Sequence, residues 1–395
     1  MSASDLGKRA WLPALTASAA LALAIATAGC GAPNVAASHR AVTPAVRLAA
    51  SHPRVNSGRR PAGLPRYFAD IVRATGSVGG AGLVQIRSSA TGRLAASQPS
   101  IDALGIAAYD GGSRLLIAEQ VGHACASGLY RAALSRRGVL GTLSRIGPRL
   151  HGLVWSLAVD ADGKIVGTAV AGCAKGQSGY LAVIHTRTDS VRRWGSVDLG
   201  GLSGGLALAF GLSMSANGGL LAFTAPGSRD TAQRVLVLRT SAAPGPIARR
   251  VRAVISKPAT GPALSAAVLS PGGKSFYLCT VSTKGTVSAR KTVTQTAVIT
   301  ARRTSDGTST GTLAKLTATG VDFLGQGFGC PMAITPNGRY LFAPYRLHYG
   351  RSTVVPPLVS AEVIGVSSPT RRAMSFRLPG SAGPTGQATG ITVAW

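Results

Sequence analysis

LSMSANGGLLAFTA, residues 212–225, is the stretch that decides the fold. Apolar and polar residues alternate up to Met214, and Asn217-Gly218 then separates them from a second apolar run over 220–225. Asn-Gly tolerates the positive φ angles of a two-residue hairpin turn, and the alternation has the period of a half-buried strand. The stretch therefore predicts a β-hairpin.

The same hairpin pattern recurs four more times along the chain. Its copies are IAAYDGGSRLLIAE (106–119), LAVDADGKIVGTAV (157–170), AVLSPGGKSFYLCT (267–280) and MAITPNGRYLFAPY (332–345). A third β-rich segment follows each hairpin, and a weaker fourth comes next; the third segments are 129–134, 180–186, 234–240, 296–302 and 361–368. Four strands in each repeat of about 40–65 residues indicate the blades of a β-propeller.

The two ends of the body supply one more blade between them. Segments 65–72 and 82–97 have the pattern of second to fourth strands, but no innermost strand precedes them. The C-terminal GITVAW, 390–395, alternates as an innermost strand does and has no partner of its own. Pairing the two ends completes the ring and hides two sheet edges. We therefore predict an all-β, six-bladed propeller over 65–395, with seven blades as the alternative if 281–330 contains another.

Two of the turns also carry a family resemblance. SPGGK at 270–274 and TPNGR at 335–339 resemble the turn of WD-type and surface-layer-type propeller repeats, although the Trp-Asp dipeptide of true WD blades is missing. Together with the N-terminal features described next, the chain resembles exported propeller proteins of high-GC Gram-positive bacteria. The resemblance implies the same propeller architecture.

Residues 1–29 predict a secretory signal peptide. Lys8-Arg9 precedes an uncharged, apolar stretch over 10–28 that ends in small residues, which is the arrangement of an export signal. The terminus Ala28-Gly29-Cys30 resembles the bacterial lipobox, which implies that Cys30 carries a lipid and becomes the new N-terminus. Thr27 stands where the lipobox usually has Leu, so ordinary cleavage and secretion remain the alternative.

Residues 30–64 predict a flexible tether between the lipid anchor and the propeller. They are rich in Pro, Ala, Ser and Arg and show no apolar periodicity. An uncleaved membrane span is disfavoured because Pro13 interrupts an apolar stretch that is barely long enough. The expected location is the extracytoplasmic face of the cell membrane, with a secreted protein as the alternative.

The chain contains four cysteines besides Cys30. An even number of cysteines in a protein with a predicted export signal indicates disulfides. Cys125 and Cys173 follow the second strands of neighbouring blades at matching positions. Cys279 lies in a second strand, and Cys330 precedes the first strand of the next blade. Of the three possible sets, this placement favours Cys125–Cys173 with Cys279–Cys330; buried, unpaired thiols are the alternative.

The chain is strongly basic, with 42 Lys and Arg against 13 Asp and Glu and a net charge of +29. Such a charge predicts attraction to polyanions, which outside the cytoplasm are anionic lipids, wall polymers or acidic proteins. Nucleic acid is not expected, because aromatic residues make up only 5% of the chain and no base-stacking motif is visible. A diffuse charge with no dedicated ligand remains the alternative, and we expect a monomer.

Three short motifs match catalytic or ion-binding patterns only in part. The G-x-S-x-G at 201–205 lacks the strand–turn–helix context of a nucleophile elbow. GGKS at 272–275 ends like a phosphate loop without its first glycine. DADG at 160–163 begins like a calcium loop but has no glutamate at the twelfth position. We therefore expect no catalytic residue, no metal site and no cofactor.

These observations favour a cell-surface binding or scaffolding propeller that recognises a protein or a polyanionic envelope ligand. The competing hypothesis is an exported propeller enzyme of hydrolase or lactonase type, with its site in the central channel. That hypothesis requires acids or metal ligands on the loops of the innermost strands, which a propeller can assemble from distant blades.

Overall fold

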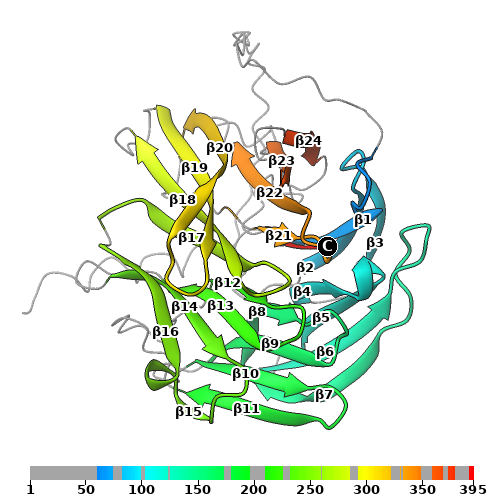
Figure 1. Cartoon of the computed structure of the whole chain (residues 1–395). Helices are drawn as coiled ribbons and strands as arrows, with labels where there is room; N and C mark the ends of the chain where they lie inside the picture. The colour runs from blue at the N-terminus through cyan, green and yellow to red at the C-terminus, as the bar shows by residue number, and fades with distance from the viewer. Residues whose placement is uncertain are drawn as a thin grey trace, which may run out of the picture. The chain divides into compact units, whose positions relative to one another are not determined.

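Six antiparallel sheets arranged as the blades of a β-propeller make up the computed structural model of this chain (Figure 1). The prediction of an all-β, six-bladed propeller is therefore confirmed. The structure describes residues 60–73, 82–98, 103–122, 125–172, 179–195, 210–225, 232–258, 260–284, 292–321, 330, 332–347, 358–367, 372–378 and 391–395.

The first three blades lie at the beginning of the described chain, and blade 1 also takes its innermost strand from the C-terminus. Blade 1 consists of β25 (Ile391–Ala394), β1 (Tyr67–Arg73), β2 (Gly82–Ser88) and β3 (Leu94–Gln98). Blade 2 consists of β4 (Ala103–Tyr109), β5 (Arg114–Gln120), β6 (Ala126–Ala133) and β7 (Ser144–His151). Blade 3 consists of β8 (Leu153–Val159), β9 (Ile165–Ala171), β10 (Tyr180–His185) and β11 (Ser190–Gly195).

The remaining blades follow in chain order. Blade 4 consists of β12 (Phe210–Met214), β13 (Leu220–Ala225), β14 (Gln233–Arg239) and β16 (Val251–Lys257). Blade 5 consists of β17 (Ala263–Leu269), β18 (Ser275–Lys284), β19 (Thr292–Arg303) and β20 (Ser309–Val321). Blade 6 consists of β21 (Ala333–Ile334), β22 (Tyr340–Leu347), β23 (Leu358–Gly365) and β24 (Arg372–Leu378).

Pairing of the two chain ends closes the ring. The innermost strands contact one another in the order β25, β4, β8, β12, β17 and β21, and β21 returns to β25. β25 pairs with β1 in antiparallel register, so that Ala394 lies opposite Ala69. Behind this strand, the rings of Phe68 and Phe342 are 4.6 Å apart, and those of Phe342 and Trp395 are 5.2 Å apart. The C-terminal strand therefore fills blade 1 and seals its boundary with blade 6.

Hydrogen bonds link the repeated hairpin turns of blades 2 to 5 to one another. The backbone N–H of Asp110 donates to the Ala161 carbonyl (2.9 Å), that of Ala161 to Ala216 (2.9 Å), and that of Ala216 to Pro271 (2.8 Å). Gly163 has a φ of 72°, and a Cβ there would overlap the ring of Tyr109 in the preceding blade. Each turn is thus bonded to the next, until Pro271, which has no N–H to donate.

Blade 5 is built from unusually long strands. β18, β19 and β20 contain 10, 12 and 13 residues, whereas β17 contains 7. The alternative of a seventh blade rested on the segment 281–330. Most of this segment belongs to the long strands of blade 5 and does not form a separate sheet. The described residues of this segment contain no further blade.

A short strand covers the outer edge of blade 3. β15 (Gly245–Pro246) belongs to the connection within blade 4, yet it pairs in parallel with β11. The indole N–H of Trp194 donates to the Ala243 carbonyl over 3.0 Å, and Ile247 is fully buried beneath this connection. The described helices are two turns of three residues, 110–112 and 247–249, and neither is long and apolar enough to cross a membrane.

One disulfide joins blades 5 and 6. Cys279 in β18 is bonded to Cys330, which precedes β21, with the two Cα atoms 6.3 Å apart. Both side chains are buried. Cys125 is also disulfide-bonded; its predicted partner Cys173 lies outside the described residues, so the Cys125–Cys173 pair stays a prediction.

Deleting residues 391–395 should destabilise the whole propeller. The deletion removes the buried Trp395 and leaves the edge of β1 unpaired. Trp395→Ala, which keeps the strand, should lower the free energy of unfolding by about 3–5 kcal/mol, the usual loss for a buried aromatic. The deletion should lower it further in a denaturant titration. A truncated protein that unfolds at the same denaturant concentration as the full chain would contradict the role of β25.

Replacing Cys279 and Cys330 together by alanine should also lower the free energy of unfolding. The bond closes a loop with a sequence separation of 51 residues, for which the chain-entropy model gives about 4 kcal/mol. The measurement is chemical unfolding with and without reductant, supported by non-reducing peptide mapping. Peptides that pair Cys330 with Cys125 would show that the assignment is wrong.

Candidate functional site

One end of the ring gathers all the repeated turns. Because neighbouring strands of a blade are antiparallel, the connections from first to second strand and from third to fourth strand emerge at the same end. We call this end the turn face; its described residues are 60–66, 89–93, 110–114, 134–143, 160–164, 186–189, 215–219, 239–250, 270–274, 303–308 and 335–339. The chain also enters the propeller here, since β1 starts at this end.

The turn face is strongly basic. It exposes fourteen Arg and Lys side chains against five Asp residues, one of which is buried. The basic residues are Arg60, Arg66, Arg93, Arg114, Arg136, Arg137, Lys164, Arg187, Arg239, Arg249, Arg250, Lys274, Arg303 and Arg339. All six blades or their connections contribute, so the face forms one continuous positive end of the ring.

Four of the five acidic residues of this face, Asp110, Asp160, Asp162 and Asp306, make local contacts. Asp110 forms an ion pair with Arg114 (3.4 Å), and Asp162 forms one with Lys164, which lowers the pKa of Asp162. The buried Asp160 accepts hydrogen bonds from the backbone N–H groups of residues 164 and 165, at 2.7 and 3.1 Å. Burial nevertheless raises the pKa of Asp160. Within the described residues, the other twelve cations of the face have no carboxylate ion-pair partner.

The partial motifs are turns wherever the structure describes them. GGKS at 272–275 is the turn between β17 and β18, with the Gly273 N–H bonded to the Ser270 carbonyl. DADG at 160–163 is the corresponding turn of blade 3, stabilised by the Asp160 carboxylate. Both lie on the turn face as hairpin connections. Ser203 of the G-x-S-x-G motif lies outside the described residues, as does Cys30.

The described residues also bear on the enzyme hypothesis. They contain no group of three or more His, Cys, Asp or Glu side chains that could hold a metal ion. Asp110, Asp160 and Asp162 are described acids on the loops that follow the innermost strands β4 and β8, and their carboxylates are engaged in ion pairs or hydrogen bonds within their own turns. Asp102, Asp198 and Asp322 lie outside the described residues.

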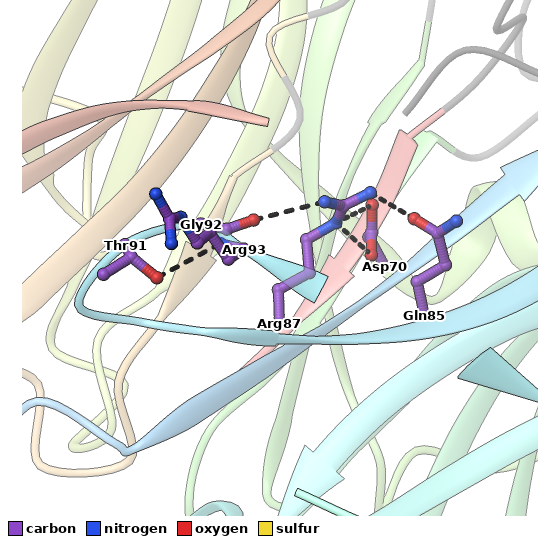
Figure 2. Close-up of polar contacts among 6 residues, drawn as sticks. All are labelled: Asp70, Gln85, Arg87, Thr91, Gly92 and Arg93. Atoms are coloured by element: carbon purple, nitrogen blue, oxygen red, sulfur yellow. Dashed lines mark hydrogen bonds and ion pairs between the residues drawn. The ribbon is translucent and has the colours of Figure 1, made fainter. Parts of the chain in front are cut away.

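Blade 1 contains a buried ion pair between Arg87 and Asp70. The Arg87 Nε–H lies 3.1 Å from both carboxylate oxygens of Asp70, and both side chains are fully buried (Figure 2). Arg87 also donates to the Gly92 carbonyl over 3.2 Å and to Gln85 Oε1. The arginine thereby joins β1, β2 and the turn before β3.

Burial raises the pKa of Asp70 to about 6, while the charge and hydrogen bonds of Arg87 act in the opposite direction. The folded chain therefore takes up this proton near pH 6, whereas the unfolded chain takes it up near the ordinary value of 3.8. This difference in pKa stabilises the folded protein. The stabilisation is fully present below pH 3.8 and is lost as the pH rises through 6. Because no solvent reaches the pair, we assign it a structural role.

Sequence reasoning did not identify this pair. Asp70 lies in YFADIVR and Arg87 in GLVQIRS, each at a position that the strand alternation places on a buried face. A charge of each sign at such positions in neighbouring strands was the available signal, because buried charges occur as pairs. Their register, Asp70 opposite Gln85 and Phe68 opposite Arg87, brings the two side chains to the same side of the sheet.

Comparison with known proteins bears on the fold. No protein-family model and no curated protein matches this chain. Among solved structures it is similar to TolB from Acinetobacter baumannii, with 14% identity and a TM-score of 0.52 over 85% of this chain and 67% of that one. It is also similar to the periplasmic gluconolactonase PpgL of Pseudomonas aeruginosa, with 12% identity and a TM-score of 0.44 over 83% and 99% of the two chains. The likeness to TolB bears out the propeller fold and extends to the fold alone.

Arg87→Met should destabilise the protein far more than Arg114→Met. The first change leaves a buried carboxylate without its cation, which typically costs about 3–5 kcal/mol at neutral pH. The second breaks an exposed pair, whose side chains are 51% and 59% accessible, and should cost at most about 1 kcal/mol. Losing Arg87 also raises the pKa of Asp70 further, so the deficit of Arg87→Met should shrink between pH 7 and pH 5. Equal losses for both variants at every pH would contradict this account.

Proposed function

We propose that this protein is an exported propeller that binds or scaffolds at the cell surface. A lipid on Cys30 tethers it to the extracytoplasmic face of the membrane, and its turn face binds polyanionic components of the envelope. The N-terminal export signal and the lipobox-like Ala28-Gly29-Cys30 support this location. The buried Cys279–Cys330 disulfide supports it too, because such bonds persist in oxidising compartments.

The charge of the turn face is the observation that carries the proposal. Fourteen exposed cations there face only five acids, and only two of the cations have a described carboxylate partner. A surface of one sign attracts the opposite charge over about 8–10 Å at physiological salt and raises the rate of encounter with a polyanion. Because the cations are spread over all the blades, they suit an extended ligand or surface better than one small anion.

The proposal predicts two separable modes of attachment. With the lipid removed by Cys30→Ser, the exported protein should remain in the envelope fraction near 0.1 M salt and be released near 1 M, where the screening length falls to about 3 Å. The wild-type protein should remain at both concentrations. Mass spectrometry of the N-terminus reports whether Cys30 is acylated. An unmodified N-terminus would contradict the lipid anchor and favour the alternative, a secreted protein.

A charge-matched pair of variants tests the face itself. In the Cys30→Ser background, Arg187, Arg239, Lys274 and Arg303 of the turn face are changed to glutamine. The control changes Arg149, Arg234, Lys257 and Lys284, which lie toward the opposite strand ends. The turn-face variant should leave the envelope at a clearly lower salt concentration than the control. Equal release would mean that the net charge acts diffusely and that no binding face exists.

A further inference from the structure

At blades 1 and 2, the turn face and the adjoining first residue of β3 combine cations with exposed apolar side chains. Leu94 and Val139 are 50% and 54% exposed, and they are the exposed large hydrophobic residues of the described chain. Arg93 precedes Leu94, and Arg137 lies two residues before Val139. We call this group the entry patch; it consists of Arg66, Arg93, Leu94, Arg136, Arg137 and Val139.

Contacts between blades 1 and 2 hold the entry patch together. Arg66 Nη1 donates to the Arg136 carbonyl over 3.0 Å, and the Tyr67 hydroxyl donates to the same oxygen over 3.3 Å. At Gly138, a Cβ would lie 3.1 Å from Ala95 Cβ and against the Tyr67 ring. Gly138 and Ala95 are the chain neighbours of Val139 and Leu94, so the two exposed apolar residues flank the same contact between blades 1 and 2.

The loop of blade 2 presents its residues in a fixed conformation. Ser135 Oγ accepts hydrogen bonds from the N–H groups of Arg137 (3.3 Å) and Val139 (3.0 Å). The Ser135 N–H donates to the Val139 carbonyl, and the Gly138 N–H donates to the Ser135 carbonyl. A preformed loop loses little conformational freedom on binding, which favours a contact made by few side chains.

The chain enters the propeller beside this patch. Residues 62 and 63 are bonded to blade 6, where Asn337 Nδ2 donates to the Gly63 carbonyl (2.7 Å) and the Tyr340 hydroxyl donates to Ala62 (3.2 Å). Arg66 then belongs to the patch. A flexible chain of the twenty-nine residues that separate Cys30 from Arg60 would span about 30 Å, and a fully extended one at most about 100 Å. An anchor at Cys30 would therefore keep this end of the ring close to the bilayer.

We propose that the entry patch docks on an anionic phospholipid bilayer. The arginines pair with lipid phosphates, and Leu94 and Val139 enter the boundary between headgroups and acyl chains. The inference rests on the proposed function, because it needs the exported, anchored protein. A bilayer explains the combination of side chains better than a wall polymer does, since exposed apolar groups gain nothing from a hydrated polyanion but are buried by lipid. Docked in this way, the ring presents its opposite end outward.

Vesicle binding tests the entry patch directly. The exported Cys30→Ser protein should bind vesicles of equal parts phosphatidylglycerol and phosphatidylcholine and should not bind pure phosphatidylcholine. An arginine at an anionic surface contributes about a fivefold change in affinity, so Arg136→Gln with Arg137→Gln should weaken binding about 30-fold. The control, Arg249→Gln with Arg250→Gln, removes the same charge from the blade 4 connection and should weaken it less than about threefold, by the long-range field alone.

The apolar residues separate a bilayer from any other polyanion. Leu94→Ser with Val139→Ser should weaken vesicle binding at least about fivefold through the lost apolar burial, yet leave retention on immobilised heparin unchanged. Tryptophan at position 139 (Val139→Trp) should be quenched by brominated lipid. Unchanged vesicle binding of the serine variant, or equal losses for the two arginine pairs, would overturn the inference.

Failure of the inference differs from failure of the proposed function. If the protein is released from envelopes by salt but does not bind anionic vesicles, docking of the entry patch on a bilayer is refuted, and a polyanionic wall polymer is the ligand of the turn face. A protein that binds neither envelopes nor vesicles would refute both. Melting temperatures equal to that of the parent show that the variants are folded, which is expected because Arg136, Arg137, Leu94 and Val139 are all exposed.

Discussion

Pairing of β25 with β1 is the interaction on which the rest of the ring depends. Each innermost strand contacts the innermost strands of both neighbouring blades, so a missing one would deprive two other blades of a packing partner. Here that strand comes from the opposite end of the chain, and Trp395 closes the aromatic cluster with Phe68 and Phe342. The same pairing brings both ends of the propeller chain to the turn face, so the proposed tether would join the propeller at this end.

Charge is distributed over the molecule in two different ways. Arg87 and Asp70 are withdrawn from water in blade 1, where hydrogen bonds to Gln85 and Gly92 compensate for the lost hydration. The fourteen cations of the turn face are left in water, mostly without described carboxylate partners. The buried pair holds together the strands of blade 1, where the ring closes. The exposed cations leave their positive charge available to an external anion.

The hairpins and the closing strand could be predicted from the sequence because short-range rules determine them. Asn217-Gly218 and its equivalents encode a turn locally, and GITVAW at the C-terminus had no other partner. The length of β19 and β20 could not be predicted, since a long alternating segment looks the same whether it forms two long strands or four short ones. The β15 edge cover, the Arg87–Asp70 pair and the grouping of Leu94 with Val139 depend on contacts between residues distant in the sequence, for which local patterns carry little signal.

The hydrogen-bonded chain of turns ends at Pro271, and this gives the ring a distinct seam. Pro271 packs against Gly338 instead of donating a hydrogen bond, with its Cδ 3.0 Å from the place of a Cβ. The boundary between blades 5 and 6 is held elsewhere, by the Cys279–Cys330 bond and by the Cys330 N–H, which donates to Ser265 Oγ over 2.7 Å. In a reducing environment this boundary would lose its covalent bond, and the Cys330 hydrogen bond and side-chain packing alone would hold it, so slow amide exchange at this boundary should depend on redox conditions. The stability of the closed ring therefore depends on the redox conditions of the compartment in which the protein folds.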